Sequence, residues 1–155
     1  MGFKVLFLDF DGVLNSRKYL RNVGDYGVVI DPERMRLLKG IIDATEAKIV
    51  LTTSWRVHWD KDTEACKETG KKINDIFNEY DLKIYDKTSV LGTDRESEIR
   101  AWLEEHFETE NFAVLDDMFL DADFLRGHFV RTSDYKDGLD EETSAQAVRI
   151  LNAEE

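Results

Sequence analysis

The order of apolar and polar residues along the chain predicts alternating strands and helices. Three runs, residues 4–9, 48–52 and 112–116, are apolar at consecutive positions, which is typical of strands covered on both faces of a parallel sheet. Weaker apolar runs at 82–85 and 128–132 bring the expected number of strands to about five.

The segments between these runs have helical spacing and recognisable ends. Asp31 and Pro32 suit an N-cap and a first helical position. Thr93 and Glu96 have the spacing of a capping box. Further helices are expected at 73–80 and from Asp140, with a polar and weaker one at 62–69.

Strands that alternate with helices in one chain indicate an α/β layered domain with right-handed crossovers. A length of 155 residues suits one domain, and the sequence contains no repeat or linker. We therefore expect a single domain over residues 1–155, with helices on both faces of a mainly parallel, Rossmann-like sheet.

Composition excludes several classes of protein. Hydrophobic residues make up 42% of the chain, which argues against disorder, and no apolar run is long enough to cross a membrane. The N-terminus lacks the pattern of a signal peptide and of a myristoylation site. With the single Cys66, these features favour a cytoplasmic protein. No obligate protein partner is evident.

Polar residues follow the three clearest strands. Asp9 and Asp11 follow the first, Thr52 and Thr53 the second, and Asp116 with Asp117 the third. In α/β sheets ligands bind at the carboxyl ends of the strands, so these side chains are expected to share one edge. One acid pair there would usually be a solvated loop, but two pairs and a hydroxyl run favour a site.

The spacing of the acids favours a metal ion. Asp9 and Asp11 would share a strand face about 6.6 Å apart, with a repulsion of about 2.5 kcal/mol. Mg²⁺ suits a site of one or two carboxylates that also binds a phosphate. Gly12 would allow the backbone near Asp11 to approach the ion.

Other kinds of site have little support in the sequence. A lone D-x-D also occurs in metal-dependent glycosyltransferases. Cys66 has no catalytic histidine pattern near it, which argues against a cysteine nucleophile. His58, His106 and His128 lack the spacing of zinc ligands.

Three motifs, in order, resemble those of the haloacid dehalogenase (HAD) superfamily of phosphotransferases. They are LDFDGVLN, IVLTTSWR and FAVLDDMFLDAD. More narrowly, LTTSWR, DRESEIRAWL and RTSDYKDGLD are similar to the HAD domain associated with RNA repair proteins.

The resemblance implies a five-stranded sheet with the first strand at its centre. It also implies that Asp9 attacks phosphorus and that Asp11 acts first as general acid and then as general base. Mg²⁺ would be held by the Asp9 and Asp116 carboxylates and the Asp11 backbone carbonyl, with Asp117 in support. Because family members that cleave carbon–halogen bonds lack the second aspartate, Asp11 favours phosphoryl chemistry.

The phosphate-binding residues implied for the substrate are Thr52, Thr53, Arg95 and Arg56. The third family motif usually offers a lysine. Arg95 has the best position here and can clamp phosphate bidentately, while Lys87 is the competitor. Arg95 could instead be a surface residue paired with an acid on its own helix.

The spacing leaves room for a flap between Asn15 and Asp31 but not for a cap domain. In the family, open sites accompany large substrates such as proteins or nucleic-acid ends. A flap with Arg17, Lys18 and Arg21 could attract an anion, although solvated charges on a hairpin are an equal alternative. The aromatic side chains of Trp55, His58 and Trp59 could stack on a base, although core packing is the simpler expectation for Trp55.

The function expected from the sequence is an Mg²⁺-dependent phosphatase that uses an aspartyl-phosphate. Its substrate would be a phosphorylated nucleotide or a nucleic-acid end. A formal charge of −12 opposes broad binding to nucleic acid or membrane. The alternatives are a receiver-like domain that accepts a phosphoryl group for signalling, and an inactive HAD-fold binding domain.

Overall fold

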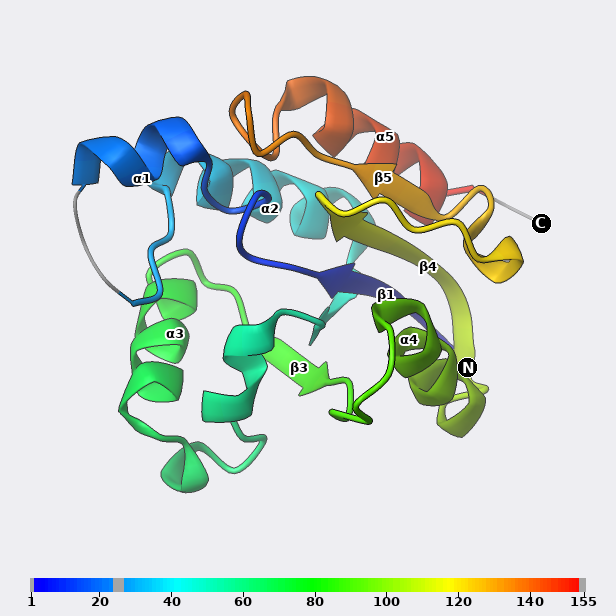
Figure 1. The fold of residues 1–155 in the computed structure, drawn as a ribbon. Coiled ribbons are helices and arrows are strands. Elements are labelled where there is room, and N and C mark those ends of the chain that lie inside the picture. The colour runs from blue at the N-terminus through cyan, green and yellow to red at the C-terminus, as the bar shows by residue number, and fades with distance from the viewer. Residues whose placement is uncertain (1, 24–26, 154–155) are drawn as a thin grey trace.

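The first strand lies at the centre of a five-stranded sheet in the computed structural model, which describes residues 2–23 and 27–153 (Figure 1). The strands are β1 (Phe3–Leu8), β2 (Lys48–Leu51), β3 (Ile84–Lys87), β4 (Thr109–Asp116) and β5 (Phe129–Arg131). Their order is β3-β2-β1-β4-β5, and every neighbouring pair is parallel. The expected Rossmann-like sheet is confirmed.

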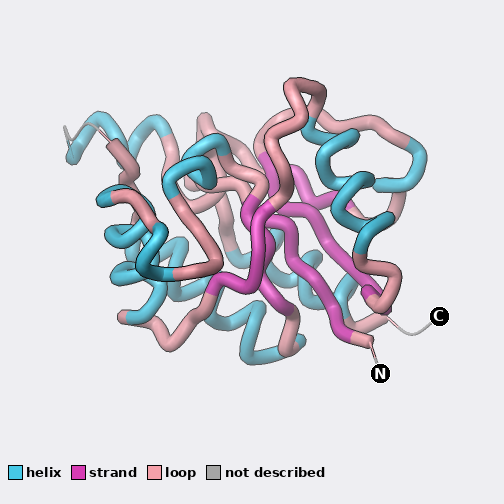
Figure 2. Tube along the Cα trace, turned by 90° about the horizontal axis from the view of Figure 1, so that it is seen from below, coloured by secondary structure: helices cyan, strands magenta, loops and turns pink. Residues whose placement is uncertain are grey.

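Helices cover both faces of this sheet (Figure 2). The α-helices are α1 (Arg17–Val23), α2 (Pro32–Thr45), α3 (Glu68–Asn78), α4 (Arg95–Glu105) and α5 (Glu141–Leu151). Short 3₁₀ turns are η1 (Ser54–His58), η2 (Thr63–Ala65) and η3 (Asp123–Leu125).

Alternate side chains of β1 enter two separate apolar clusters. Leu6 and Leu8 pack in the cluster that contains the buried faces of α2, α3 and α5. Val5 and Phe7 enter the cluster on the other face, with α4, where the Phe7 ring meets Trp102 edge-on at 5.5 Å between centroids. Burial on both faces explains why β1 is apolar at consecutive positions.

Helix ends follow the sequence with three corrections. The helix expected at 73–80 is α3, which begins at Glu68 and ends at Asn78. Asp31 and Asp140 cap α2 and α5 as expected. The cap of α4 is Asp94 instead of Thr93, because the Asp94 carboxylate accepts the Ser97 N–H at 2.7 Å. The stretch 62–69 forms η2 and only the start of α3, since it lacks an apolar stripe to bury.

The connection from β1 to α2, where a flap was expected, contains the helix α1. Residues 24–26 of that connection lie outside the described residues. Within residues 2–23 and 27–153 no folded cap is inserted, so one α/β domain carries the site. None of the helices there is long and apolar enough to span a bilayer.

Candidate active site

Two neighbouring strands bring the site together at their carboxyl ends. From β1 the chain passes to β2 and β3 on one side, whereas β4 and β5 lie on the other. Leu8 pairs with Leu115, and the Asp9 N–H donates to the Leu115 carbonyl at 3.1 Å. Asp9 and Asp116 therefore leave their strands side by side, at the switch point where such sheets bind ligands.

A glycine turn follows Asp9 and Asp11. Gly12 has φ of +84°, and a Cβ there would lie 2.3 Å from Oδ2 of Asp117. The Gly12 carbonyl accepts a hydrogen bond of 2.6 Å from the Thr132 hydroxyl. Only glycine therefore allows the turn after Asp11 to approach the Asp117 side chain this closely.

Three carboxylates form the centre of the site. Asp9, Asp116 and Asp117 each place an oxygen within 4.8 Å of the others. Burial and the charge of Asp116 raise the pKa of Asp9 to about 7, although Arg95 and the Phe10 N–H act in the opposite direction. Burial and Asp116 also raise the pKa of Asp117. These acids would be stabilised by additional positive charge.

One guanidinium reaches this cluster. Arg95 Nη1 lies 3.1 Å from Asp9 Oδ2 and 2.7 Å from Asp116 Oδ2. Burial acts to lower the pKa of Arg95, but the two carboxylates outweigh it and raise the pKa. Lys87 instead donates its ammonium hydrogens to the Arg56 and Trp59 carbonyls. The structure thus brings Arg95 to the acids and keeps Lys87 apart from them.

The two threonines after β2 have different environments. Thr53 is buried, and its hydroxyl accepts the Trp55 N–H at 3.3 Å. The hydroxyl of Thr52 is also buried and has no hydrogen-bond partner among the described residues. Because a buried polar group without a partner is costly, the Thr52 hydroxyl is suited to a ligand at this edge.

The Asp11 carboxylate is held outside the three-acid group. Its Oδ1 accepts a 3.0 Å hydrogen bond from Asn15 Nδ2, and its Oδ2 accepts one of 3.1 Å from Trp55 Nε1. Asn15 is itself buried and accepts the Gly12 N–H at 3.0 Å. These contacts of Asn15 and Trp55 with Asp11 were not predicted from the sequence. The available signal was an asparagine directly after the apolar pair Val13 and Leu14.

Arg56 lies close to the site but faces the protein. Each of its five N–H groups has an acceptor, so none remains for the phosphate expected from the sequence. The acceptors are the carbonyls of Thr52, Thr53, Thr88 and Ser89, at 2.9–3.3 Å, and the carboxylate of Glu98, at 3.1 Å. Arg56 therefore ties the loop after β2 to the loop after β3 and to α4.

The donor set fits Mg²⁺. Among the described residues, Arg95 pairs with two of the three carboxylates, Asp9 and Asp116, so the cluster has a surplus of negative charge. Carboxylate oxygens are the hard ligands that this ion prefers. Asp9, Asp116 and Asp117 could therefore hold it through their side chains.

Comparison with known protein families agrees with this arrangement. The family described as "HAD domain in Swiss Army Knife RNA repair proteins" matches residues 5–144. No match is found among curated proteins or among solved structures. The matched range includes the acids, the Thr52 loop and Arg95, and it covers most of the chain. The chain therefore belongs to the family of HAD domains found in Swiss Army Knife RNA repair proteins.

Proposed function

We propose that this domain is an Mg²⁺-dependent phosphatase that hydrolyses phosphoric monoesters through an aspartyl-phosphate. The observation that carries the proposal is the meeting of Asp9, Asp116 and Arg95, with contacts of 3.1 and 2.7 Å, at the carboxyl edge of the sheet. Phosphate monoesters hydrolyse so slowly that enzymes accelerate the reaction by up to ~10²¹. Several groups must therefore act together.

Asp9 is the nucleophile in this proposal. Its Oδ1 is held by the Phe10 N–H at 2.9 Å. Attack by the carboxylate on phosphorus forms an oxygen–phosphorus bond and breaks the bond to the leaving alkoxide. Arg95, and the unpartnered hydroxyl of Thr52, would bind the phosphoryl oxygens.

Asp11 is the general acid and base. It would give a proton to the leaving alkoxide and later take one from the water that cleaves the aspartyl-phosphate. Its carboxylate is oriented by Asn15 and Trp55, which come from different elements. An aspartate two residues beyond the nucleophile supports hydrolysis over stable phosphorylation.

Mg²⁺ would be held by the Asp9, Asp116 and Asp117 carboxylates, together with the backbone carbonyl of Asp11, and would neutralise charge on the phosphoryl oxygens. Burial and the charge of Asp116 raise the pKa values of Asp9 and Asp117, which supports a site that binds a cation.

We further propose a nucleotide or nucleic-acid terminal phosphate as substrate. The supporting observations are the absence of a folded cap over the site within residues 2–23 and 27–153, and the family's description, which refers to RNA repair proteins. An uncapped edge can admit the end of a polymer.

Turnover of para-nitrophenyl phosphate tests the chemistry. The purified chain should hydrolyse it with Mg²⁺, and Asp9→Asn should abolish the activity. Asp43→Asn, on the exposed face of α2 where the carboxylate pairs with Lys39, is the matched control. A stable stoichiometric phosphoprotein without turnover would favour a receiver-like role, and no reaction at all would favour an inactive binding domain.

A further inference from the structure

Exposed apolar side chains gather around the candidate active site. The described residues expose eight large hydrophobic side chains, and six of them follow the carboxyl ends of four strands. The six are Val57 after β2, Val90 and Leu91 after β3, Met118 and Phe119 after β4, and Tyr135 after β5. Phe107 lies at the opposite edge, between α4 and β4. In a chain with 35% charged residues, such clustering marks a binding surface.

Two of these side chains are aromatic rings that stand beside arginines. Phe119 is 69% exposed, and the Arg131 guanidinium carbon lies 5.8 Å from its centroid. Tyr135 is 78% exposed, and the Arg17 guanidinium carbon lies 4.2 Å from its centroid. Each ring is therefore mostly exposed and has a guanidinium over it, and Arg17 also pairs with the Asp134 carboxylate at 2.7 Å.

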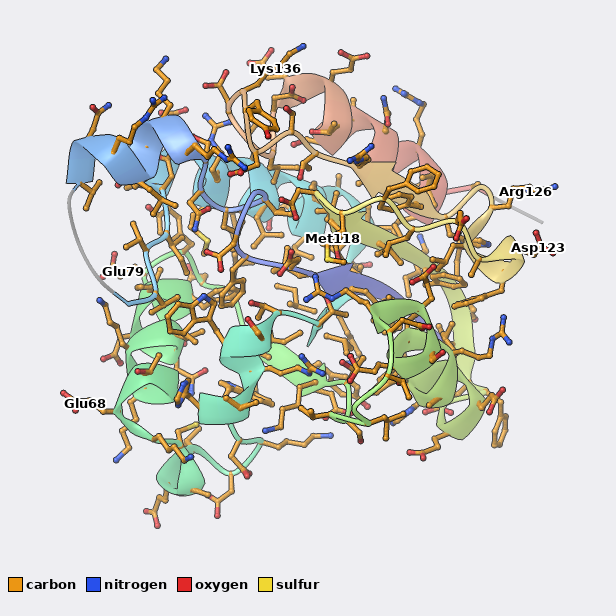
Figure 3. The ribbon with its side chains drawn as sticks, in the orientation of Figure 1. Glu68, Glu79, Met118, Asp123, Arg126 and Lys136 are labelled. Atoms are coloured by element: carbon orange, nitrogen blue, oxygen red, sulfur yellow. The ribbon has the colours of Figure 1, made fainter. Side chains whose placement is uncertain are left out.

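The residues next to the Phe119 ring form hydrogen bonds with the candidate metal-binding acids. Met118, at the carboxyl end of β4 (Figure 3), donates its N–H to Asp116 Oδ1 at 2.9 Å. Arg131 donates to the Asp117 carbonyl at 3.0 Å. Phe119 is two residues beyond Asp117, so the Cα atoms of these residues lie within about 7 Å of each other.

The loop that carries Tyr135 packs against the loop that carries Asp11. The loop before α5, which also carries Lys136 (Figure 3), packs on the chain around Asn15. A Cβ on Gly138 would lie 2.6 Å from the Asn15 carbonyl, and the Arg17 N–H donates to the Asp134 carbonyl at 3.1 Å. Asn15 in turn contacts Asp11.

We infer that Phe119 and Tyr135 bind unstacked nucleobases next to the terminal phosphate of a single-stranded nucleic acid. This inference rests on the proposed phosphatase function and assigns residues to its substrate. Every base offers a flat face to an aromatic ring, and the Arg131 guanidinium near Phe119 suits the phosphodiester that follows the base. A duplex end would present paired, stacked bases and could not use these rings in this way.

The charge of the chain limits how many nucleotides are bound. A net charge of −12 opposes contact with a long phosphate backbone, so attraction is confined to the few cations at this rim. Affinity should therefore rise over the first two or three nucleotides and then stop rising. Binding should also depend only weakly on salt.

Steady-state kinetics on oligouridylates of increasing length tests the inference. Substrates of one, two, three and six nucleotides would carry the phosphate at the 3′ end in one series and at the 5′ end in another. KM should fall up to the trinucleotide for one of these ends, and an abasic trinucleotide with the same backbone should lose most of the gain. Phe119→Ala and Tyr135→Ala should each raise KM by about 5- to 150-fold, the range that one base–aromatic stack contributes.

Matched controls separate binding from folding and from chemistry. The kcat on para-nitrophenyl phosphate should stay within about twofold in both variants, since neither ring is assigned a part in the chemical step. Phe107 lies at the opposite edge and is 91% exposed. Phe107→Ala should leave KM and kcat unchanged for every substrate. Fluorescence anisotropy of a labelled trinucleotide with Asp9→Asn measures binding without turnover, so this inference and the proposed chemistry can fail separately.

Three results would overturn the inference. The first is an abasic trinucleotide with the same KM as the normal trinucleotide. The second is an unchanged KM in both ring variants while the wild type still prefers oligonucleotides. The third is a phosphopeptide of equal charge with the lower KM, which would assign the apolar rim to a protein substrate.

Discussion

Arg56 in η1 and Arg95 at the start of α4 have opposite surroundings. Arg56 and Arg95 are both mostly buried, with 5% and 16% of their side chains exposed. Arg56 meets one carboxylate and four backbone carbonyls, so its charge and its hydrogen-bond donors are satisfied. Arg95 meets two carboxylates of a group of three, which leaves negative charge in excess. The charge of Arg56 is balanced by Glu98, and this pair supports the fold. The acids around Arg95 keep an excess of negative charge, which favours binding of a further cation.

Removal of Arg56 should have the largest effect on stability. Arg56→Ala leaves the Glu98 carboxylate buried without its partner, and four carbonyls lose a donor. We expect a loss of about 3–5 kcal/mol in the free energy of unfolding, measured by urea denaturation. Mg²⁺ should not restore it. A variant as stable as the wild type would contradict the structural role of Arg56.

Arg95→Ala should give a loss that Mg²⁺ does restore. Without Arg95, Asp9 and Asp116 face each other with no cation between them, so stability at pH 8 in EDTA should fall by about 3 kcal/mol. A divalent cation at the same acids should recover most of this loss. Denaturation with and without Mg²⁺ measures the recovery, and equal losses in both conditions would remove the contrast between the two arginines.

The titration of Asp9 gives stability a dependence on pH. Its pKa rises from 3.8 to about 7 in the folded protein, so between these values the folded protein binds more protons than the unfolded chain. The contribution of Asp9 to stability without metal should therefore be complete below the lower value and be lost as pH rises towards 7, by up to about 1.4 kcal/mol per unit. The pKa of Asp117 is also raised, so its titration lowers stability in the same direction as pH rises.

Asp9→Asn should remove most of that slope and raise stability at pH 8. The experiment is urea denaturation in EDTA from pH 5 to 8 for wild type, Asp9→Asn and the control Asp43→Asn, whose carboxylate is mostly exposed. The control should keep the slope of the wild type. Parallel curves for wild type and Asp9→Asn would show that Asp9 titrates normally.

Trp55→Phe should have a smaller and selective effect. The substitution keeps an aromatic ring but removes the N–H that holds Asp11 Oδ2 at 3.1 Å. Protonation by Asp11 matters most for a basic leaving group, so kcat on an alkyl phosphate should fall about tenfold while kcat on para-nitrophenyl phosphate changes less than twofold. Equal losses on both substrates would indicate a general structural defect.

The sheet and the positions of its acids could be predicted from the sequence. Strands buried on both faces must be apolar at consecutive positions, and in a parallel sheet the polar residues that follow them meet at one edge. Asp9 and Asp116 could be placed together for this reason. The central position of the first strand came from the resemblance to a known family.

The choice between the cations could not be predicted from the sequence. Arg56 and Lys87 find their partners in backbone carbonyls from distant loops, and carbonyls carry no sequence signal. The Asp11 contact with Trp55 likewise depends on how the turn after β2 folds back. The cap of α4 was misplaced by one residue because Thr93 and Asp94 are both good N-caps.

Reductive trapping of the intermediate tests the central claim most directly. The enzyme is quenched during turnover and treated with borohydride, which reduces an aspartyl-phosphate to homoserine, and the peptides are analysed by mass spectrometry. We predict homoserine at position 9 when both Mg²⁺ and substrate are present, and unmodified Asp9 when either is omitted. Continued turnover with no modification at Asp9, or with the modification at Asp11, would contradict the account.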